Sequence, residues 1–93
     1  MYAVAFDLSV DQTKISHPKG VSQAYAEIGS ILSNHGARWV QGSLYVTDDE
    51  DMAKLFQAIL ALRAAPWFPA SVRDIRAFRI EQWSDFTAIV KDP

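Results

Sequence analysis

The order of the apolar patterns along this chain constrains its fold more than any single motif does. Residues 2–8, YAVAFDL, alternate as a β-strand does, and both faces are mostly apolar, which is typical of a strand covered on both sides. A polar loop is expected over residues 9–19. Apolar side chains over residues 21–32 then follow helical spacing, and Gly36 suits the left-handed conformation that ends many helices. The chain therefore opens with a strand and a helix.

A hairpin and a second helix follow. The segments ARWVQ and LYVT predict two short strands, because Gly42 and Ser43 between them suit a tight hairpin turn. Thr47 and Glu50 have the spacing of a capping box, which predicts that the second helix begins there. Apolar residues at helical spacing carry this helix to about Arg63.

The last strand completes a recognisable order of elements. Residues 72–83, VRDIRAFRIEQW, read as a strand, and Ser84 is expected to cap a short terminal helix. The order β-α-β-β-α-β predicts a single α+β domain over residues 1–93, with a ferredoxin-like antiparallel sheet and both main helices on one face. The other face stays open although residues 2–8 are apolar on both sides. A second copy of the chain is the simplest cover, so the sequence predicts a dimer.

This topology brings polar residues that are distant in the sequence to the end of the sheet where residues 2–8 finish. Each has an ordinary structural interpretation. Asp7 can form an ion pair with Arg73 or Arg76, Ser43 can be a turn residue, and His17 can be a solvated loop histidine. The residues expected at this end are Asp7, His17, Ser43, Arg73 and Asp74.

Composition limits the function classes. The net charge of −2 and pI of about 5.5 create no overall field that attracts nucleic acid, so any RNA-binding surface must be local or assembled by oligomerisation. The absence of cysteine excludes disulfides and thiolate metal sites and suits the cytoplasm. The first apolar run is too short for a signal peptide or a membrane span.

Three longer segments, MYAVAFDL, WVQGSLYV and SVRDIRAFRIEQWSDFT, resemble the virulence-associated protein D (VapD) family of small bacterial proteins. The resemblance covers nearly the whole chain. It implies a ferredoxin-like dimer related to small CRISPR-associated nucleases, an endoribonuclease activity on RNA such as mRNA, and a role as the toxin of a toxin–antitoxin system with a small antitoxin partner. Matched by position, it also implies that Asp7, Ser43 and Asp74 are active-site residues. In the CRISPR-associated relatives, two such aspartates face each other across the dimer and can hold a divalent ion.

Two routes to RNA cleavage stay open. Asp7 can hold Mg²⁺ or Mn²⁺, which are hard ions that prefer oxygen ligands. A metal-free route needs a base, and His17 is the imidazole expected at this end. Arg73, Arg76 and His17 are the predicted RNA-binding residues, since cations stabilise phosphate charge. The alternatives are a non-catalytic dimeric module that binds RNA or an antitoxin, and a regulatory domain that senses a small metabolite.

Overall fold

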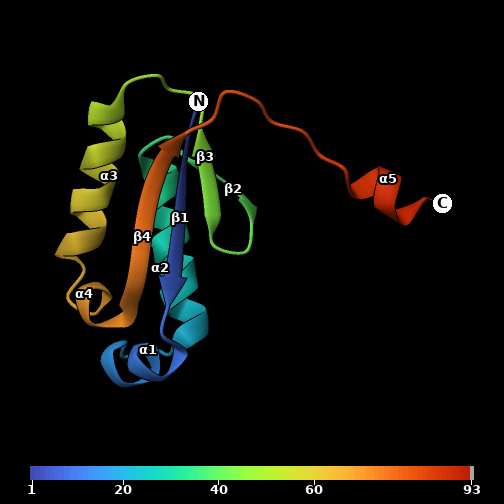
Figure 1. Ribbon diagram of the computed structural model, residues 1–93. Helices are drawn as coiled ribbons and strands as arrows, with labels where there is room; N and C mark the ends of the chain where they lie inside the picture. Colours follow the sequence, from blue (N-terminus) through green and yellow to red (C-terminus); the bar gives the residue numbers. More distant parts are fainter. Residues whose placement is uncertain (93) are drawn as a thin grey trace.

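The computed structural model describes residues 1–92, which form a four-stranded antiparallel sheet in the order β2-β3-β1-β4. The strands are β1 (Tyr2–Leu8), β2 (Arg38–Gln41), β3 (Leu44–Thr47) and β4 (Val72–Arg79). The helices are α1 (Val10–Ser16), α2 (Val21–Asn34), α3 (Met52–Ala64), α4 (Phe68–Ser71) and α5 (Thr87–Lys91). The two crossover helices, α2 and α3, lie on one side of the sheet (Figure 1). The predicted ferredoxin-like α+β fold is confirmed.

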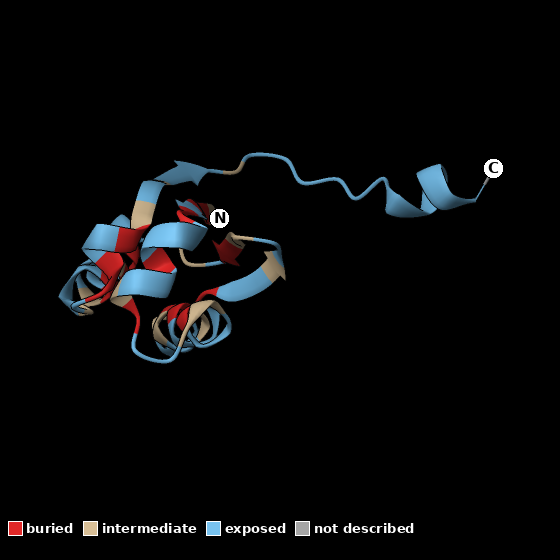
Figure 2. Ribbon diagram, turned by 90° about the horizontal axis from the view of Figure 1, so that it is seen from below, coloured by how far each residue is buried: buried red, intermediate tan, exposed pale blue. Residues whose placement is uncertain are grey.

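The core lies between the sheet and the crossover helices, where Figure 2 shows the buried residues gathered. Phe6 and Leu8 of β1 point into it and join the fully buried Ile28 and Leu32 of α2 and Leu62 of α3. Each such side chain stabilises the fold by about 1.5–3 kcal/mol. Because side chains alternate along a strand, the side chain of the intervening Asp7 points to the opposite face of the sheet. We call that face, which α2 and α3 do not cover, the open face.

The expected loop over residues 9–19 is wrong, since α1 occupies most of it. Ser9 caps this helix by accepting a hydrogen bond from the backbone N–H of Gln12 at 3.2 Å. The hydroxyl of Thr13 donates to the Ser9 carbonyl at 2.6 Å and is fully buried. The apolar residues Val10 and Ile15 are exposed, so α1 has no buried apolar stripe that periodicity would reveal.

The start of α3 also differs from the predicted capping box. Asp51 is the N-cap residue, and its carboxylate accepts from the backbone N–H of Ala53 at 2.9 Å. Thr47 instead accepts from the backbone N–H of Asp49 at 3.2 Å, which turns the chain before the N-cap of the helix. Consecutive acidic residues offer several equivalent caps, and the sequence does not separate them.

The C-terminal segment is less regular than expected. β4 ends at Arg79, and residues 80–86 form no regular element. Ser84 is not the cap of α5, because the N-cap residue is Phe86, and the Asp85 carboxylate accepts from the backbone N–H of Thr87 at 2.9 Å. None of the helices within residues 1–92 has the length and hydrophobicity needed to cross a membrane.

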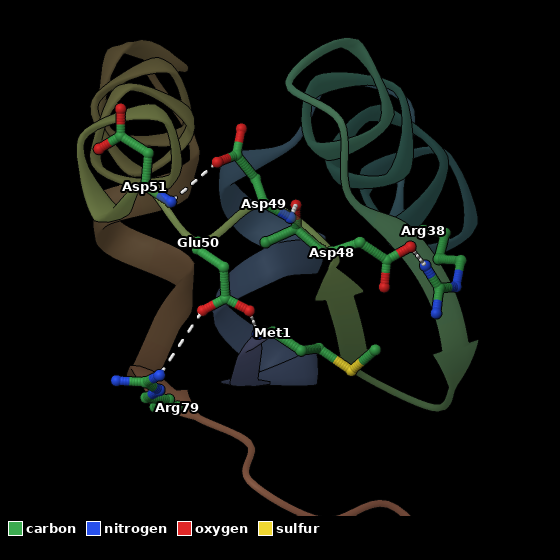
Figure 3. Close-up of polar contacts among 8 residues, drawn as sticks. Met1, Arg38, Asp48, Asp49, Glu50, Asp51 and Arg79 are labelled. Carbon is green, nitrogen blue, oxygen red and sulfur yellow. Dashed lines mark hydrogen bonds and ion pairs between the residues drawn. The ribbon is translucent and has the colours of Figure 1, made fainter.

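Glu50 connects the N-terminus, the segment before α3 and the end of β4, at the end of the sheet opposite Asp7 (Figure 3). Its carboxylate pairs with the amino group of Met1, and its other oxygen lies 3.9 Å from Nη2 of Arg79. The bond to the Met1 ammonium is the main reason that the pKa of Glu50 lies below its ordinary value of 4.5. A lowered pKa in the folded state adds stability that is present above the unfolded pKa and is lost as pH falls through the folded pKa.

We therefore expect Glu50→Gln to lower the melting temperature slightly at pH 7 and to weaken its dependence on pH below about 5. The effect is small because the carboxylate is exposed to solvent. Thermal unfolding of both proteins between pH 7 and pH 3 measures it. If the melting temperatures of the two proteins differ by the same amount at every pH in this range, the role given to Glu50 is contradicted.

Candidate active site

Asp7 and Asp74 are directly opposite each other across the β1–β4 ladder, on the open face. Two like charges in this relation repel each other. Arg76 offsets one of them, because its Nε donates to both oxygens of Asp74 at 3.1 and 3.0 Å. No ion pair reaches Asp7 within residues 1–92, so the alternative in which Arg73 or Arg76 pairs with it is not realised. Asp7 is thus an exposed carboxylate, and it lies beside Asp74, whose charge is offset by Arg76.

Arg73 lies in a bulge next to this pair. The register of the ladder shifts after Asp7, so that Leu8 is opposite Val72 and Arg73 is the extra residue of β4. A bulge increases the local twist and redirects the side chain of the extra residue. Arg73 is exposed, and the bulge places a second cation at the end of the sheet that carries the two aspartates.

Ser43 reaches the same end through the hairpin turn. Its carbonyl accepts from the backbone N–H of Phe6 at 3.2 Å, next to Asp7 in the sequence. The turn before it uses Gly42 at a φ of 49°, a conformation that favours glycine. The structure thus brings the predicted residues of strands and hairpin together at one end of the sheet. These residues are Asp7, Ser43, Arg73, Asp74 and Arg76.

His17 follows α1 at this end too, but its side chain lies on the helix side of the sheet. The ring is only 7% exposed, so the solvated loop histidine is a wrong prediction. Its Nδ1 accepts from the backbone N–H of Lys19 at 3.0 Å, which leaves the proton on Nε2, 3.2 Å from Oε2 of Glu27. The indole of Trp67 donates to the same oxygen and meets the His17 ring edge-on at 4.8 Å between centroids.

This network lines a cavity of about 640 Å³, between the α1–α2 connection, α2 and the segment that contains α4. Asp7 does not line it. Both nitrogens of His17 already have hydrogen-bond partners, so neither is free to take a proton from a substrate in this arrangement. Its predicted contact with RNA is untested, and the geometry favours a structural role. Glu27 and Trp67 lie 10 and 50 positions from His17, and no local spacing in the sequence connects them.

We expect His17→Ala to destabilise the fold by about 1–3 kcal/mol, because it removes a buried ring and leaves the backbone N–H of Lys19 without its acceptor. The melting temperature should fall by several degrees in a domain of this size. RNA cleavage measured well below the melting temperature should stay close to that of the unchanged protein. A normal melting temperature with lost cleavage would instead place His17 in the reaction.

The donor set for a divalent ion is small. Within residues 1–92, no three histidine, aspartate or glutamate side chains gather closely enough to hold a metal. Asp7 and Asp74 offer carboxylates on one face, although Asp74 is shared with Arg76. Mg²⁺ is often held by one or two carboxylates together with water and substrate phosphates. The pair suits such an ion when RNA or a second chain completes its ligands.

No protein-family model matches the chain, but curated proteins do. A protein named endoribonuclease VapD homolog, from Neisseria gonorrhoeae, is 65% identical over 98% of this chain and 99% of its own length. Endoribonuclease VapD of Haemophilus influenzae is 58% identical over 99% of this chain and 100% of its own length. The chain belongs to the VapD family. A Helicobacter pylori endoribonuclease VapD is also 43% identical over 98% of this chain and 99% of its own length.

Membership of the VapD family confirms the resemblance inferred from the three long segments. The matches to these relatives extend over the sheet, the crossover helices and the C-terminal segment, because they leave at most two residues of this chain unmatched. The site of this VapD protein must therefore be sought within the fold described above.

Proposed function

We propose that this VapD protein is an endoribonuclease that cuts RNA at the end of the open face where Asp7 lies. The observation that carries the proposal is the exposed carboxylate of Asp7, which has no ion pair among residues 1–92 and lies directly opposite the Asp74–Arg76 pair and beside Arg73. The names of the three relatives support the reaction type. We place the activity in the cytoplasm, where a bacterial RNA substrate is found.

One role for Asp7 is that of a general base. Its carboxylate would take the proton of a ribose 2′-hydroxyl, while the 2′-oxygen forms a bond to phosphorus and the bond from phosphorus to the 5′-oxygen breaks. The leaving 5′-oxygen takes up a proton, and the products carry a 2′,3′-cyclic phosphate and a 5′-hydroxyl. Arg73 and Arg76 would stabilise the added negative charge on the phosphate. Asp74 acts as a positioning residue because it holds Arg76.

The other role for Asp7 is that of a metal ligand. Asp7, with help from Asp74, would hold Mg²⁺ or Mn²⁺ against the RNA phosphate. A bound ion of this kind activates water and stabilises the leaving oxygen. Asp7 then fixes the position of the phosphate, and the 2′-hydroxyl takes no part.

Incubation of the purified protein with end-labelled RNA separates these roles. The RNA is incubated with Mg²⁺, with Mn²⁺ and with chelator in separate reactions, and the proposal predicts internal cleavage in at least one of them. Cleavage that persists in chelator and leaves cyclic phosphates assigns the base role to Asp7. Cleavage that stops in chelator and leaves ends formed by hydrolysis assigns the ligand role. Intact RNA under all conditions contradicts the proposal, and a gel shift of that RNA would favour the non-catalytic binding module.

We further propose a homodimer and a small antitoxin as protein partners. The homodimer is supported by the open face, on which Phe78 is 47% exposed. A stripe on α3, formed by Met52, Phe56 and Leu60 at 43%, 59% and 43% exposure, offers an apolar surface for the antitoxin. Light scattering at micromolar concentration is expected to give twice the 10.4 kDa chain mass. A single chain mass would contradict the homodimer.

A further inference from the structure

Trp39 is a large aromatic residue on the outer strand of the sheet. β2 is the last strand in the order β2-β3-β1-β4, so one of its edges has no neighbouring strand within residues 1–92 (Figure 1). The side chain of Trp39 is 63% exposed. In contrast, Trp67 is buried in the core, and Trp83 lies in the segment after β4. Trp39 is therefore available for contact with another molecule.

The indole of Trp39 is held in place next to the hairpin turn. Its Nε1 donates a hydrogen bond to the carbonyl of Gly42 at 3.0 Å. The next residue, Ser43, accepts at its own carbonyl from the backbone N–H of Phe6 at 3.2 Å. Two hydrogen bonds and the turn thus connect the indole to the residue before Asp7. A ring that is oriented before a ligand arrives loses less entropy on binding.

The indole leaves β2 on the side of the sheet that carries α2. Trp39 is directly opposite Tyr45 in the β2–β3 ladder, and residues in this relation point to the same side of a sheet. Tyr45 is buried in the core, where its ring stacks on Phe6 with 6.3 Å between centroids. Two copies that pair through their open faces therefore leave Trp39 uncovered.

The surface between Asp7 and the indole is open at the hairpin turn. A Cβ atom added to Gly42 would meet no other atom within 4 Å, so no side chain covers the turn at that point. The N–H edge of the indole is bonded to Gly42, and a side chain with this exposure has at least one ring face open. An extended chain can lie across the turn and reach this face.

This arrangement suits a single strand of RNA. Proteins bind such strands by combining cations, which hold the phosphates, with aromatic rings, which stack on the bases. Arg73 and Arg76 supply the cations at the Asp7 end. β2 lies two strands from β1, which is about 10 Å. Stacked nucleotides follow one another at about 3.4 Å, so the indole is within about three nucleotides of a phosphate at Asp7.

We propose that Trp39 stacks on a base of the RNA within about three nucleotides of the cleaved bond and so positions the strand at Asp7. The inference rests on the endoribonuclease of the proposed function and deepens it by naming the substrate class. A base inside a duplex is already stacked on its neighbours, so the substrate is single-stranded beside the cut. Every base has a stacking face, so Trp39 does not require one base identity.

An abasic scan tests the stacked base with the unchanged protein. The substrate is an RNA that is cut at one position, and each nucleotide within three positions of the cut is replaced in turn by an abasic one. At one position, the change should raise KM on the order of 10-fold or more and leave kcat nearly constant, because stacking holds the strand before and during the reaction. An equal KM for every abasic RNA overturns the inference.

The Trp39→Ala variant shows whether Trp39 makes this contact. Its KM for the intact RNA should rise on the order of 10-fold or more, and the abasic nucleotide should then raise KM no further, since both changes remove one contact. Trp39→Phe keeps a ring and should restore part of the binding. Phe56→Ala is the control, because it removes an aromatic side chain that is 59% exposed on α3. An abasic effect that persists in Trp39→Ala overturns the inference.

Tryptophan fluorescence measures the stacking without cleavage. A single-stranded RNA that is 2′-O-methylated throughout, in the presence of chelator, permits neither of the two routes of cleavage. Its binding should quench the fluorescence of the unchanged protein and of Trp83→Phe, because a stacked base quenches an indole. Quenching should be lost in Trp39→Phe, and a duplex of the same sequence should quench little. Quenching in Trp39→Phe that equals that of the unchanged protein overturns the inference.

The outcomes separate the two proposals. Intact RNA under all conditions overturns the endoribonuclease, and the fluorescence titration then still decides whether Trp39 stacks on RNA. A Trp39→Ala protein with an unchanged KM overturns the stacking and leaves the endoribonuclease standing. If light scattering shows that this variant loses its partner chain while its KM stays the same, Trp39 is a contact between protein chains and the stacking is overturned.

Discussion

Asp7→Asn is expected to reduce RNA cleavage by on the order of 100-fold or more, because an amide can act neither as base nor as an anionic metal ligand. The shape of the side chain is kept. Asp7 is exposed and has no ion pair within residues 1–92, so no attraction is lost. The repulsion from Asp74 is removed, and the melting temperature should hold or rise.

Asp48→Asn is the matched control for this variant. It makes the same chemical change and shifts the net charge equally, but Asp48 pairs with Arg38 at 2.7 Å, at the far end of the sheet (Figure 3). Its cleavage rate should stay near that of the unchanged protein. An Asp7→Asn protein that is folded and fully active removes Asp7 from the mechanism. The initial rate on a fluorescent RNA and thermal unfolding of the same preparation are the two measurements.

Asp74→Asn is expected to lower cleavage by about 10-fold to 100-fold with little change in stability. The carboxylate holds Arg76 through two hydrogen bonds, and an amide offers one acceptor oxygen in place of two. The side chains of Asp74 and Arg76 are 51% and 77% exposed, and exposed ion pairs contribute only about 0–1 kcal/mol to stability. The melting temperature should shift by less than about 8 °C.

The kinetic constants show whether Asp74 acts through Arg76. A positioning role predicts that kcat falls more than KM rises, because the arginine still attracts the phosphate but is poorly placed in the transition state. Asp74→Glu keeps the charge and should restore part of the rate. A melting temperature that falls in proportion to the lost activity would contradict this role and make Asp74 a purely structural residue.

The order of strands in the sheet could be predicted because apolar residues repeat every two positions in the strands and at helical spacing in α2 and α3. The resulting order β-α-β-β-α-β is typical of one sheet topology. The first helix was missed for a physical reason. Residues 10–16 bury the hydroxyl of Thr13 instead of an apolar stripe, and Ser9 with Gln12 was the only signal of its start. The predicted caps of α3 and α5 were wrong because neighbouring residues are equally good acceptors: Asp51 caps α3, and Asp85, just before the Phe86 N-cap, accepts from the first turn of α5.

The site was predictable in part. Strand direction alone placed Asp7, Ser43 and Asp74 at one end of the sheet, because antiparallel neighbours fix which ends meet. The partner of Arg76 was not predictable. Asp74, two positions away on the same strand face, and Asp7, on the neighbouring strand, are both within reach of a long side chain. The burial of His17 depends on Glu27 and Trp67, which only tertiary packing brings together.

The most direct test of RNA cleavage at the Asp7 end uses an RNA that carries a different fluorophore at each terminus. It is incubated with the unchanged protein and with Asp7→Asn, purified in parallel. We predict two singly labelled fragments that appear together at the same rate with the unchanged protein, and a rate on the order of 100-fold lower with the variant. Equal rates in both preparations, or release of single nucleotides from one terminus, would contradict an endoribonuclease whose activity depends on Asp7.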